Sequence, residues 1–225
     1  MIETLNRLDH QFMLWLNYDG GPLADAFWHA VSSMPSWIPL YVVIIGVLAY
    51  DCRREAHPWR HYLTLLLFTA LIVLAADQIS SGIIKPWVGR PRPPHQPGVM
   101  EYLHLVNDYR GGAFGFVSSH AANCFAVATW VSLLFRRCPL TLAMVCFALL
   151  NCYSRIYLGV HYPGDILCGS LLGILCGWLL YRAYGCVCRR FDFPAGPFSH
   201  PLPILLTFWL TSGVMLGYAA ACLGR

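Results

Sequence analysis

Charge is scarce in this sequence, and lysine is almost absent. Charged residues make up 12% of the 225 residues, about half the share found in ordinary soluble domains. The net charge of +4 is small and spread along the chain, without a dense basic stretch. Both features argue against a nucleic-acid partner. Lys85 is the only lysine, so arginine supplies every other fixed positive side-chain charge.

The chain also lacks the marks of a cleavable leader and of a zinc or disulfide framework. Glu3, Asp9 and Asp19 interrupt the first residues, so we expect no signal peptide. Most of the ten cysteines are scattered through apolar runs, and only Cys186 and Cys188 are close neighbours. No histidine or second cysteine pair completes a four-ligand set with them. We therefore expect buried thiols that act as small hydrophobic side chains.

Long apolar runs are abundant. Hydrophobic residues make up 57% of the sequence, and a run of about 20 such residues crosses a hydrocarbon core of roughly 30 Å. The sequence predicts an all-α, polytopic membrane helix bundle with about six transmembrane helices. The predicted spans are Trp37–Tyr50, Trp59–Ile84, Ser118–Phe135, Pro139–Tyr157, Pro163–Tyr184 and Pro201–Cys222.

Two segments of mixed polarity precede the first span. Leu5–Leu16 and Pro22–Ser33 are predicted to form amphipathic helices that lie on the membrane or against the bundle. We treat residues 1–225 as one membrane-embedded domain, with the amphipathic helices within 1–34 and an additional span at 201–222.

The arginines predict the orientation of the bundle. They cluster between the first two spans and after the third and fifth, which places those loops in the cytoplasm. The other loops then face outward, including residues 94–115, which we expect to act as a lid. The cations at Lys85, Arg90, Arg92 and Arg155 lie on this outer side, against the positive-inside rule. We expect them to serve something other than topology.

The first motif is Lys85–Pro93, KPWVGRPRP. A lysine in a chain that otherwise uses arginine indicates a need for a compact ammonium group, and the prolines would hold it in fixed relation to Arg92. Taken alone, the stretch fits a basic cap at a membrane interface equally well. Asp77 and Ser81 precede Lys85 at four-residue spacing on one face of the span. An acid within a span is a candidate functional residue, and we expect Asp77 to support the site from below.

The second motif, FVSSHAANC, lies at the start of the third predicted span. Serine is a favoured N-cap, so Ser118 and Ser119 predict a helix start whose free N–H groups and dipole attract an anion. His120 lies in the first turn of this helix. Alone, such a histidine is more often a satisfied polar residue than a catalyst.

The third motif, SRIYLGVHYPGD, runs from the fourth predicted span into the fifth. Pro163 suits a first helical turn, which places His161 just before the helix and Asp165 within that turn. Arg155 lies near the end of the preceding span. A second helix start therefore offers another anion-binding end, beside an imidazole.

Together the three motifs suit hydrolysis of a phosphate ester or diphosphate. Lys85, Arg92 and Arg155 would neutralise the phosphate charge together with the two helix starts. One neutral imidazole can attack phosphorus while a carboxylate orients it, and a second imidazole can protonate the leaving oxygen. We expect no metal ion and no other cofactor, because the sequence contains no carboxylate cluster to hold one.

The order K-x₆-R-P, S-x-H and S-R-x₅-H-x₃-D resembles the type-2 phosphatidic acid phosphatase superfamily, which includes membrane lipid phosphatases and vanadium-dependent haloperoxidases. The matching stretches are Lys85–Pro93, Ser118–His120 and Ser154–Asp165. They cover a few dozen residues, in the right order and spacing. The resemblance implies a six-helix bundle.

The resemblance also implies roles for the matched residues. His161 would be the nucleophile that forms a phosphohistidine, Asp165 its orienting partner and His120 the general acid. The implied phosphate-binding residues are Lys85, Arg92, Arg155, Ser118 and Ser119. At Ser119 the sequence departs from the usual glycine, which lets the backbone approach an anion closely. We expect the phosphate site to survive this change.

We therefore expect an integral membrane lipid phosphatase in a bacterial-type cytoplasmic membrane, with its active site facing the periplasm. Undecaprenyl diphosphate is the leading candidate substrate, and lipid A 1-phosphate and phosphatidylglycerophosphate are alternatives. The expected partners are the bilayer and its lipid phosphates. The sequence leaves open the oligomeric state and whether water or another lipid accepts the phosphate.

Two alternatives come from other classes. A vanadate-dependent haloperoxidase would use the same pocket, but its known relatives are soluble and six spans argue against it. A lipid-phosphate binder or carrier without catalysis would not need His120, His161 and Asp165, all of which are present.

Overall fold

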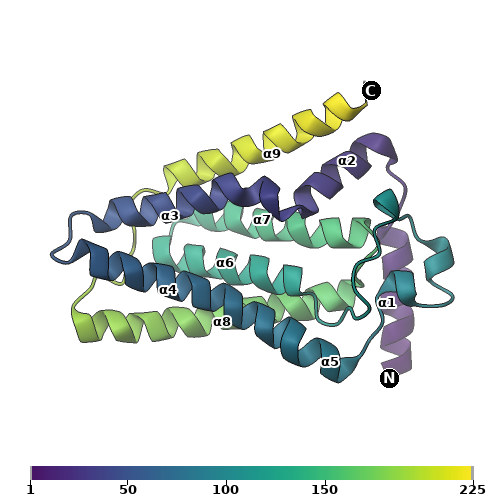
Figure 1. Cartoon of the computed structure of the whole chain (residues 1–225), viewed down its shortest axis with the longest axis horizontal. Helices are drawn as coiled ribbons and strands as arrows, with labels where there is room; N and C mark the ends of the chain where they lie inside the picture. The colour runs from purple at the N-terminus through teal and green to yellow at the C-terminus, as the bar shows by residue number, and fades with distance from the viewer. Residues whose placement is uncertain (1, 224–225) are drawn as a thin grey trace.

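The computed structural model describes residues 2–223, and within this range the protein is helical, with no β-strand. The long helices run side by side, and α1 lies crosswise over one end of the bundle (Figure 1). The helices are α1 (Ile2–Leu16), α2 (Gly21–Ser32), α3 (Ile38–Cys52), α4 (Pro58–Asp77), α5 (Lys85–Val88), α6 (Ser119–Phe135), α7 (Cys138–Tyr157), α8 (Pro163–Phe191) and α9 (Leu202–Cys222).

The prediction of a membrane helix bundle is confirmed. Among the described residues, five helical stretches are long and apolar enough to cross a membrane: Met34–Cys52, Pro58–Val88, Cys138–Tyr157, Pro163–Phe191 and Leu202–Cys222. The remaining predicted span, Ser118–Phe135, corresponds to α6, which is apolar but has only 17 residues, or about 26 Å of helix. It packs against α4, α7 and α8, so it is the interior helix of the bundle.

The two helices before the bundle occupy the positions expected for Leu5–Leu16 and Pro22–Ser33. α1 contacts α7 and α8, whereas α2 packs along α7 and α9. On α1, Phe12 and Trp15 are exposed while Met13 is fully buried. This distribution fits a helix that lies at a membrane surface with one face on the protein.

The second span continues beyond its predicted end at Ile84. Residues Gln78–Ile84 form a π-helical segment, in which the amide of Lys85 donates to the carbonyl oxygen of Ser80, and α5 then extends the helix to Val88. The sequence placed the end too early because Pro86 is a helix breaker. The wider π turn removes the clash between a proline ring and the carbonyl one turn earlier, so Lys85 lies on a helix.

A row of glycines brings α8 into backbone contact with α6. Gly169, Gly173 and Gly177 lie four residues apart on the face of α8 that meets α6. A Cβ atom at Gly169 would lie 2.4 Å from the carbonyl oxygen of Ser118. One at Gly173 would lie 2.2 Å from that of Ala122. Small residues at this spacing let two helices pack without intervening side chains, so the start of α6 is fixed beside the start of α8.

Candidate active site

The three sequence motifs meet at the end of the bundle that α1 covers (Figure 1). The ammonium of Lys85, from the first motif, donates to Ser119 Oγ of the second, at 2.5 Å. The amide of Ser118 donates to the carbonyl oxygen of Asp165, from the third, at 3.0 Å. Arg90 donates from Nη1 to Asp165 Oδ1 at 2.9 Å, which joins the first motif to the third. Hydrogen bonds therefore connect all three motifs.

The side chain of Ser119, at the position where the resembled superfamily usually has glycine, orients the lysine. Its hydroxyl accepts a hydrogen bond from Lys85 and lies 2.6 Å from Ser81 Oγ. The side chains of Ser81, Lys85 and Ser119 therefore form one hydrogen-bonded group between α6 and the π-helical segment. Asp77, about one turn before Ser81 and two before Lys85, interacts electrostatically with Lys85. The expected alignment of Asp77, Ser81 and Lys85 is thus compatible with the π turn.

Ser118 caps α6, as its sequence position predicts. Its buried hydroxyl accepts from the amide of Ala121 at 3.4 Å. His120 follows in the first turn, and its ring donates to the backbone carbonyl of Ser32 at the end of α2. The positive charges of Arg155, Arg92 and Lys85 all act on this ring. α2 therefore lies directly beside the predicted general acid.

His161 and Asp165 form a buried pair. His161 is 2% exposed and Asp165 is 0% exposed. Nδ1 of His161 lies 3.4 Å from Asp165 Oδ2, which also accepts from the amide of Tyr162 at 3.1 Å. Because Nδ1 faces the carboxylate, Nε2 is the ring nitrogen available to a substrate.

The surroundings of His161 keep its ring neutral. Burial, followed by the positive charges of Arg92, Arg155 and Lys85, lowers the pKa of His161 well below its ordinary value. His120 also acts on this ring electrostatically, so the two imidazoles share one charged environment. A neutral imidazole carries the lone pair that nucleophilic attack requires.

Arg90 and Asp9 complete the support of Asp165, and sequence reasoning assigned neither to the site. The Arg90 guanidinium binds Asp165 with one nitrogen and Asp9 Oδ2 with the other, at 2.8 Å, and lies 4.1 Å from the ring centre of Tyr162. Asp9 Oδ1 accepts from the amide of Gly164 at 2.7 Å, at the start of α8. The place of Arg90 on the predicted outer side, against the positive-inside rule, indicated a functional role. No feature of the sequence around Asp9 did so.

Two buried guanidinium groups have donors left over. Arg92 donates from Nε to the carbonyl oxygen of Phe114, while its buried Nη1 has no partner among the described residues. Arg155 donates to Ser32 Oγ at 2.5 Å and to Tyr109 Oη at 3.3 Å, while its buried Nε has no partner in the same part of the chain. Buried donors nearly always have a hydrogen-bond acceptor, and two neighbouring guanidinium groups favour an acceptor with negative charge.

The loop expected to act as a lid is held at its base and near its middle. The amide of Arg92 donates to the carbonyl oxygen of Ala113 at its base. Farther out, His104 Nε2 lies 2.8 Å from Asp25 Oδ1 on α2, and the His104 amide donates to Asn17. Tyr109, through its bond to Arg155, brings the loop to the edge of the cationic cluster. Its lid function stays a prediction.

Comparisons with known proteins agree with this arrangement. The family model described as PAP2 superfamily matches residues 63–187. A lipid A 4'-phosphatase of Bacteroides thetaiotaomicron is 39% identical over 183 residues, covering 80% of this chain and 79% of the relative. A lipid A 4'-phosphatase of Porphyromonas gingivalis is 30% identical over 228 residues, covering 100% of this chain and 94% of the relative.

A solved structure shares the fold. The transmembrane PAP2-type phosphatidylglycerolphosphate phosphatase of Bacillus subtilis superimposes with a TM-score of 0.57 at 23% identity, over 84% of this chain and 89% of that one. The chain therefore belongs to the PAP2 superfamily, as its three motifs implied, and is a membrane lipid phosphatase within it.

Proposed function

We propose that the protein removes the 4′-phosphate of lipid A through a phosphohistidine on His161. Both relatives with long matches are named lipid A 4'-phosphatase. This chain aligns with most of the length of each. This support moves lipid A ahead of undecaprenyl diphosphate, the leading candidate from the sequence. It also moves the reacting position from the 1-phosphate to the 4′-phosphate.

One observation carries the chemistry: the unpaired donors of Arg92 and Arg155 lie beside a histidine that burial keeps neutral. A phosphate bound to these donors would lie in a site from which water is largely excluded. Electrostatic interactions there are stronger than in bulk water. Lys85 and the N–H groups at the start of α6 would hold its remaining oxygens.

The reaction would then proceed in two displacements. His120 is protonated when the phosphate dianion binds beside it. Nε2 of His161 then attacks phosphorus, the bond from phosphorus to the sugar oxygen breaks, and His120 gives that oxygen its proton. Asp165 stabilises the imidazolium form through Nδ1–H. In the second step water attacks the phosphohistidine and gives its proton to His120. The nitrogen–phosphorus bond breaks, and inorganic phosphate and neutral His161 are restored.

The orientation proposed for the site follows from arginine placement. The turns at Arg53–Arg54 and Arg136–Arg137 lie at the end of the bundle opposite the motifs, as does the end of α8 (Figure 1). If these turns face the cytoplasm, the active site faces the periplasm. A site at that level of the inner membrane meets lipid head groups directly.

A lipid tail has a place next to the cationic cluster. A pocket of about 180 Å³ opens behind Arg155, and an apolar groove of about 520 Å³ runs between the α2 region and α9. The two share His29 and Ser33 as lining residues. The groove is also lined by Thr207, Leu210, Thr211, Val214 and Met215. A phosphate near Arg155 would thus leave an acyl chain beside α9.

Filling this groove should reduce activity on long-chain lipids only. We expect Val214→Trp to lower kcat/KM for a long-chain lipid phosphate about 10-fold, which corresponds to roughly two buried methylenes at about 0.8 kcal/mol each. Activity on a short-chain, water-soluble lipid phosphate should not change. Leu216→Trp is the matched control, because Leu216 is exposed on α9 but does not line the groove. Equal losses on both substrates, or equal losses in both variants, would place the tail elsewhere.

The substrate itself is tested with purified protein and a panel of lipids. Bis-phosphorylated lipid A, undecaprenyl diphosphate and phosphatidylglycerophosphate are compared by released phosphate, and tandem mass spectrometry locates the phosphate that remains on lipid A. We expect a product that keeps only the 1-phosphate, and a kcat/KM for lipid A at least about 100-fold above the others, worth about 2.7 kcal/mol of transition-state binding. A product that keeps only the 4′-phosphate would overturn the proposed position.

A further inference from the structure

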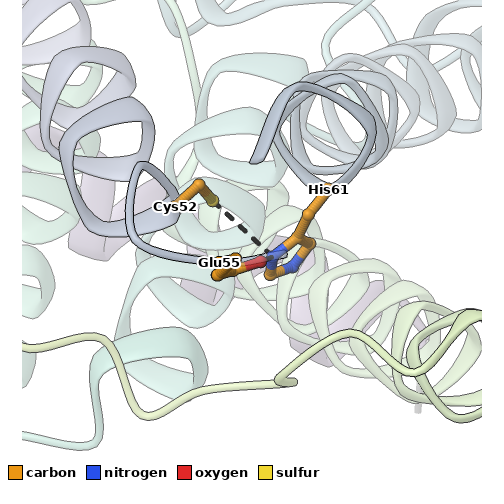
Figure 2. A group of neighbouring side chains, drawn as sticks. All are labelled: Cys52, Glu55 and His61. Carbon is orange, nitrogen blue, oxygen red and sulfur yellow. Dashed lines mark hydrogen bonds and ion pairs between the residues drawn. The ribbon is translucent and has the colours of Figure 1, made fainter. Parts of the chain in front are cut away.

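A second cluster of reactive side chains lies at the opposite end of the bundle, in the turn between α3 and α4. Cys52 ends α3, Glu55 lies in the turn, and His61 lies in the first turn of α4. Figure 2 shows the three side chains converging. Nδ1 of His61 lies 2.6 Å from Glu55 Oε2 and 3.6 Å from Cys52 Sγ, and all three atoms lie within 4.8 Å of one another.

The histidine ring of this cluster is held in one orientation. His61 is 0% exposed, and Phe193 and Phe198, from the segment between α8 and α9, stack on it with ring centres 5.0 and 6.1 Å away. Its Nε2 lies 2.5 Å from Tyr184 Oη on α8. Packing of this kind fixes the direction of Nδ1 before any ligand arrives.

The neighbours of Tyr184 bear on the tautomer of the ring. If the Tyr184 hydroxyl donates to Cys188, its oxygen accepts from Nε2–H of His61. A neutral ring with hydrogen on Nε2 has a bare lone pair on Nδ1. That lone pair faces the Glu55 carboxylate and the Cys52 sulfur. Three electron-pair donors converging on one point suit a shared cation: the thiol proton of Cys52, or a metal ion that replaces it.

We propose that Cys52, Glu55 and His61 bind a zinc ion, independently of the phosphatase reaction. With Zn–S near 2.3 Å and Zn–N near 2.0–2.1 Å, a tetrahedral site places sulfur and nitrogen about 3.6 Å apart. Cys52 Sγ and His61 Nδ1 are 3.6 Å apart. The oxygen of Glu55 would move outward by about 0.7 Å to reach the corresponding N···O spacing of about 3.3 Å. Mixed thiolate, imidazole and carboxylate ligands favour zinc among the common divalent ions.

A route to solvent reaches this site. Glu55 is a lining residue of a pocket of about 350 Å³ between the α3–α4 turn and the segment before α9. The pocket would admit the ion and supply water as the fourth ligand. Binding removes the thiol proton of Cys52, which leaves through the same pocket, and no other bond changes. The bound ion would stabilise the α3–α4 turn against Phe193 and Phe198, which lie in the segment after α8.

Cobalt binding to the purified full-length protein, stripped of metal by chelation, tests the site. We expect one Co²⁺ per chain, with a thiolate-to-cobalt charge-transfer band that Zn²⁺ displaces. Cys52→Ser should remove the band, and His61→Ala should weaken metal binding at least about 100-fold. Tyr184→Phe, which frees the ring, should weaken it about 10- to 100-fold. Cys186→Ser and His57→Ala are the matched controls, because both residues are exposed near the same end of the bundle.

Phosphatase activity measures folding in each variant, since none of these residues belongs to the phosphate site. A folded parent protein that gives no charge-transfer band, or a band that survives in Cys52→Ser, would overturn the zinc site. In the first case a shared proton, rather than a metal ion, would hold the three side chains together; in the second, another cysteine would be the ligand. Loss of the band in the parent would leave the lipid A assignment untouched, so the two proposals fail separately.

Discussion

Replacing His161 with alanine should abolish phosphate release from lipid A, with kcat reduced by about 10⁴-fold or more. Losses of this size follow removal of a nucleophile whose partners act with it as a unit. Alanine leaves the three cations in place, so the substrate should still bind. The measurement is phosphate release under single-turnover conditions, together with mass spectrometry of the acid-sensitive phosphoprotein after rapid quenching.

The control for this experiment is His95→Ala, an exposed histidine in the outer loop. It should retain the parent rate and the phosphoprotein signal, while His161→Ala should show neither. If His161→Ala turned over at the parent rate, the assigned nucleophile would be wrong. A slow variant that still formed a phosphoprotein would place the phosphate on a different residue.

Asp165→Asn should reduce kcat by about 10³- to 10⁴-fold while leaving KM nearly unchanged. In the triad of serine proteases the same change in the orienting acid costs about 10⁴-fold, because the imidazole takes the wrong tautomer. Here the carboxylate faces Nδ1 of His161 and would stabilise the imidazolium form. Asparagine keeps the shape but removes the charge, and it also weakens the bond from Arg90.

Two further variants separate this effect from general damage. Asp108→Asn changes an exposed carboxylate of the outer loop and should have no effect. Asp9→Asn removes the second partner of Arg90 but leaves the Asp165 carboxylate in place, so its loss of activity should be much smaller. An Asp165→Asn variant within about 10-fold of the parent kcat would show that His161 does not depend on this carboxylate; catalysis by a correctly placed acid or base usually supplies at least about 10²-fold.

The bilayer explains why the spans were predictable from sequence. Every transmembrane helix must satisfy its own backbone hydrogen bonds and present apolar side chains to lipid, so hydropathy alone locates it. Two span ends were placed too early. The fifth span was ended at Tyr184, whereas α8 continues to Phe191. The second was ended at Ile84, because Pro86 normally ends a helix. The π-helical segment before Pro86 accommodates the proline within the helix. The residue preferences of a sequence do not predict such a segment.

The motif residues were predictable because their chemistry is specific and their spacing is local. Asp9 was not, because its bonds to Arg90 and Gly164 connect positions 81 and 155 residues apart along the chain. The Cys52, Glu55 and His61 cluster was missed for a related reason. These residues are close in sequence, but the direction of the His61 ring depends on Tyr184, which is 123 residues away.

The glycine row on α8 also limits how a lipid reaches the site. With no side chain between their backbones, α6 and α8 form a rigid block, and that block carries both His120 and Asp165. A substrate cannot part these two helices to enter. The lipid must therefore enter past another wall of the site. The end of α2 is one such wall, where Ser32 contacts both His120 and Arg155.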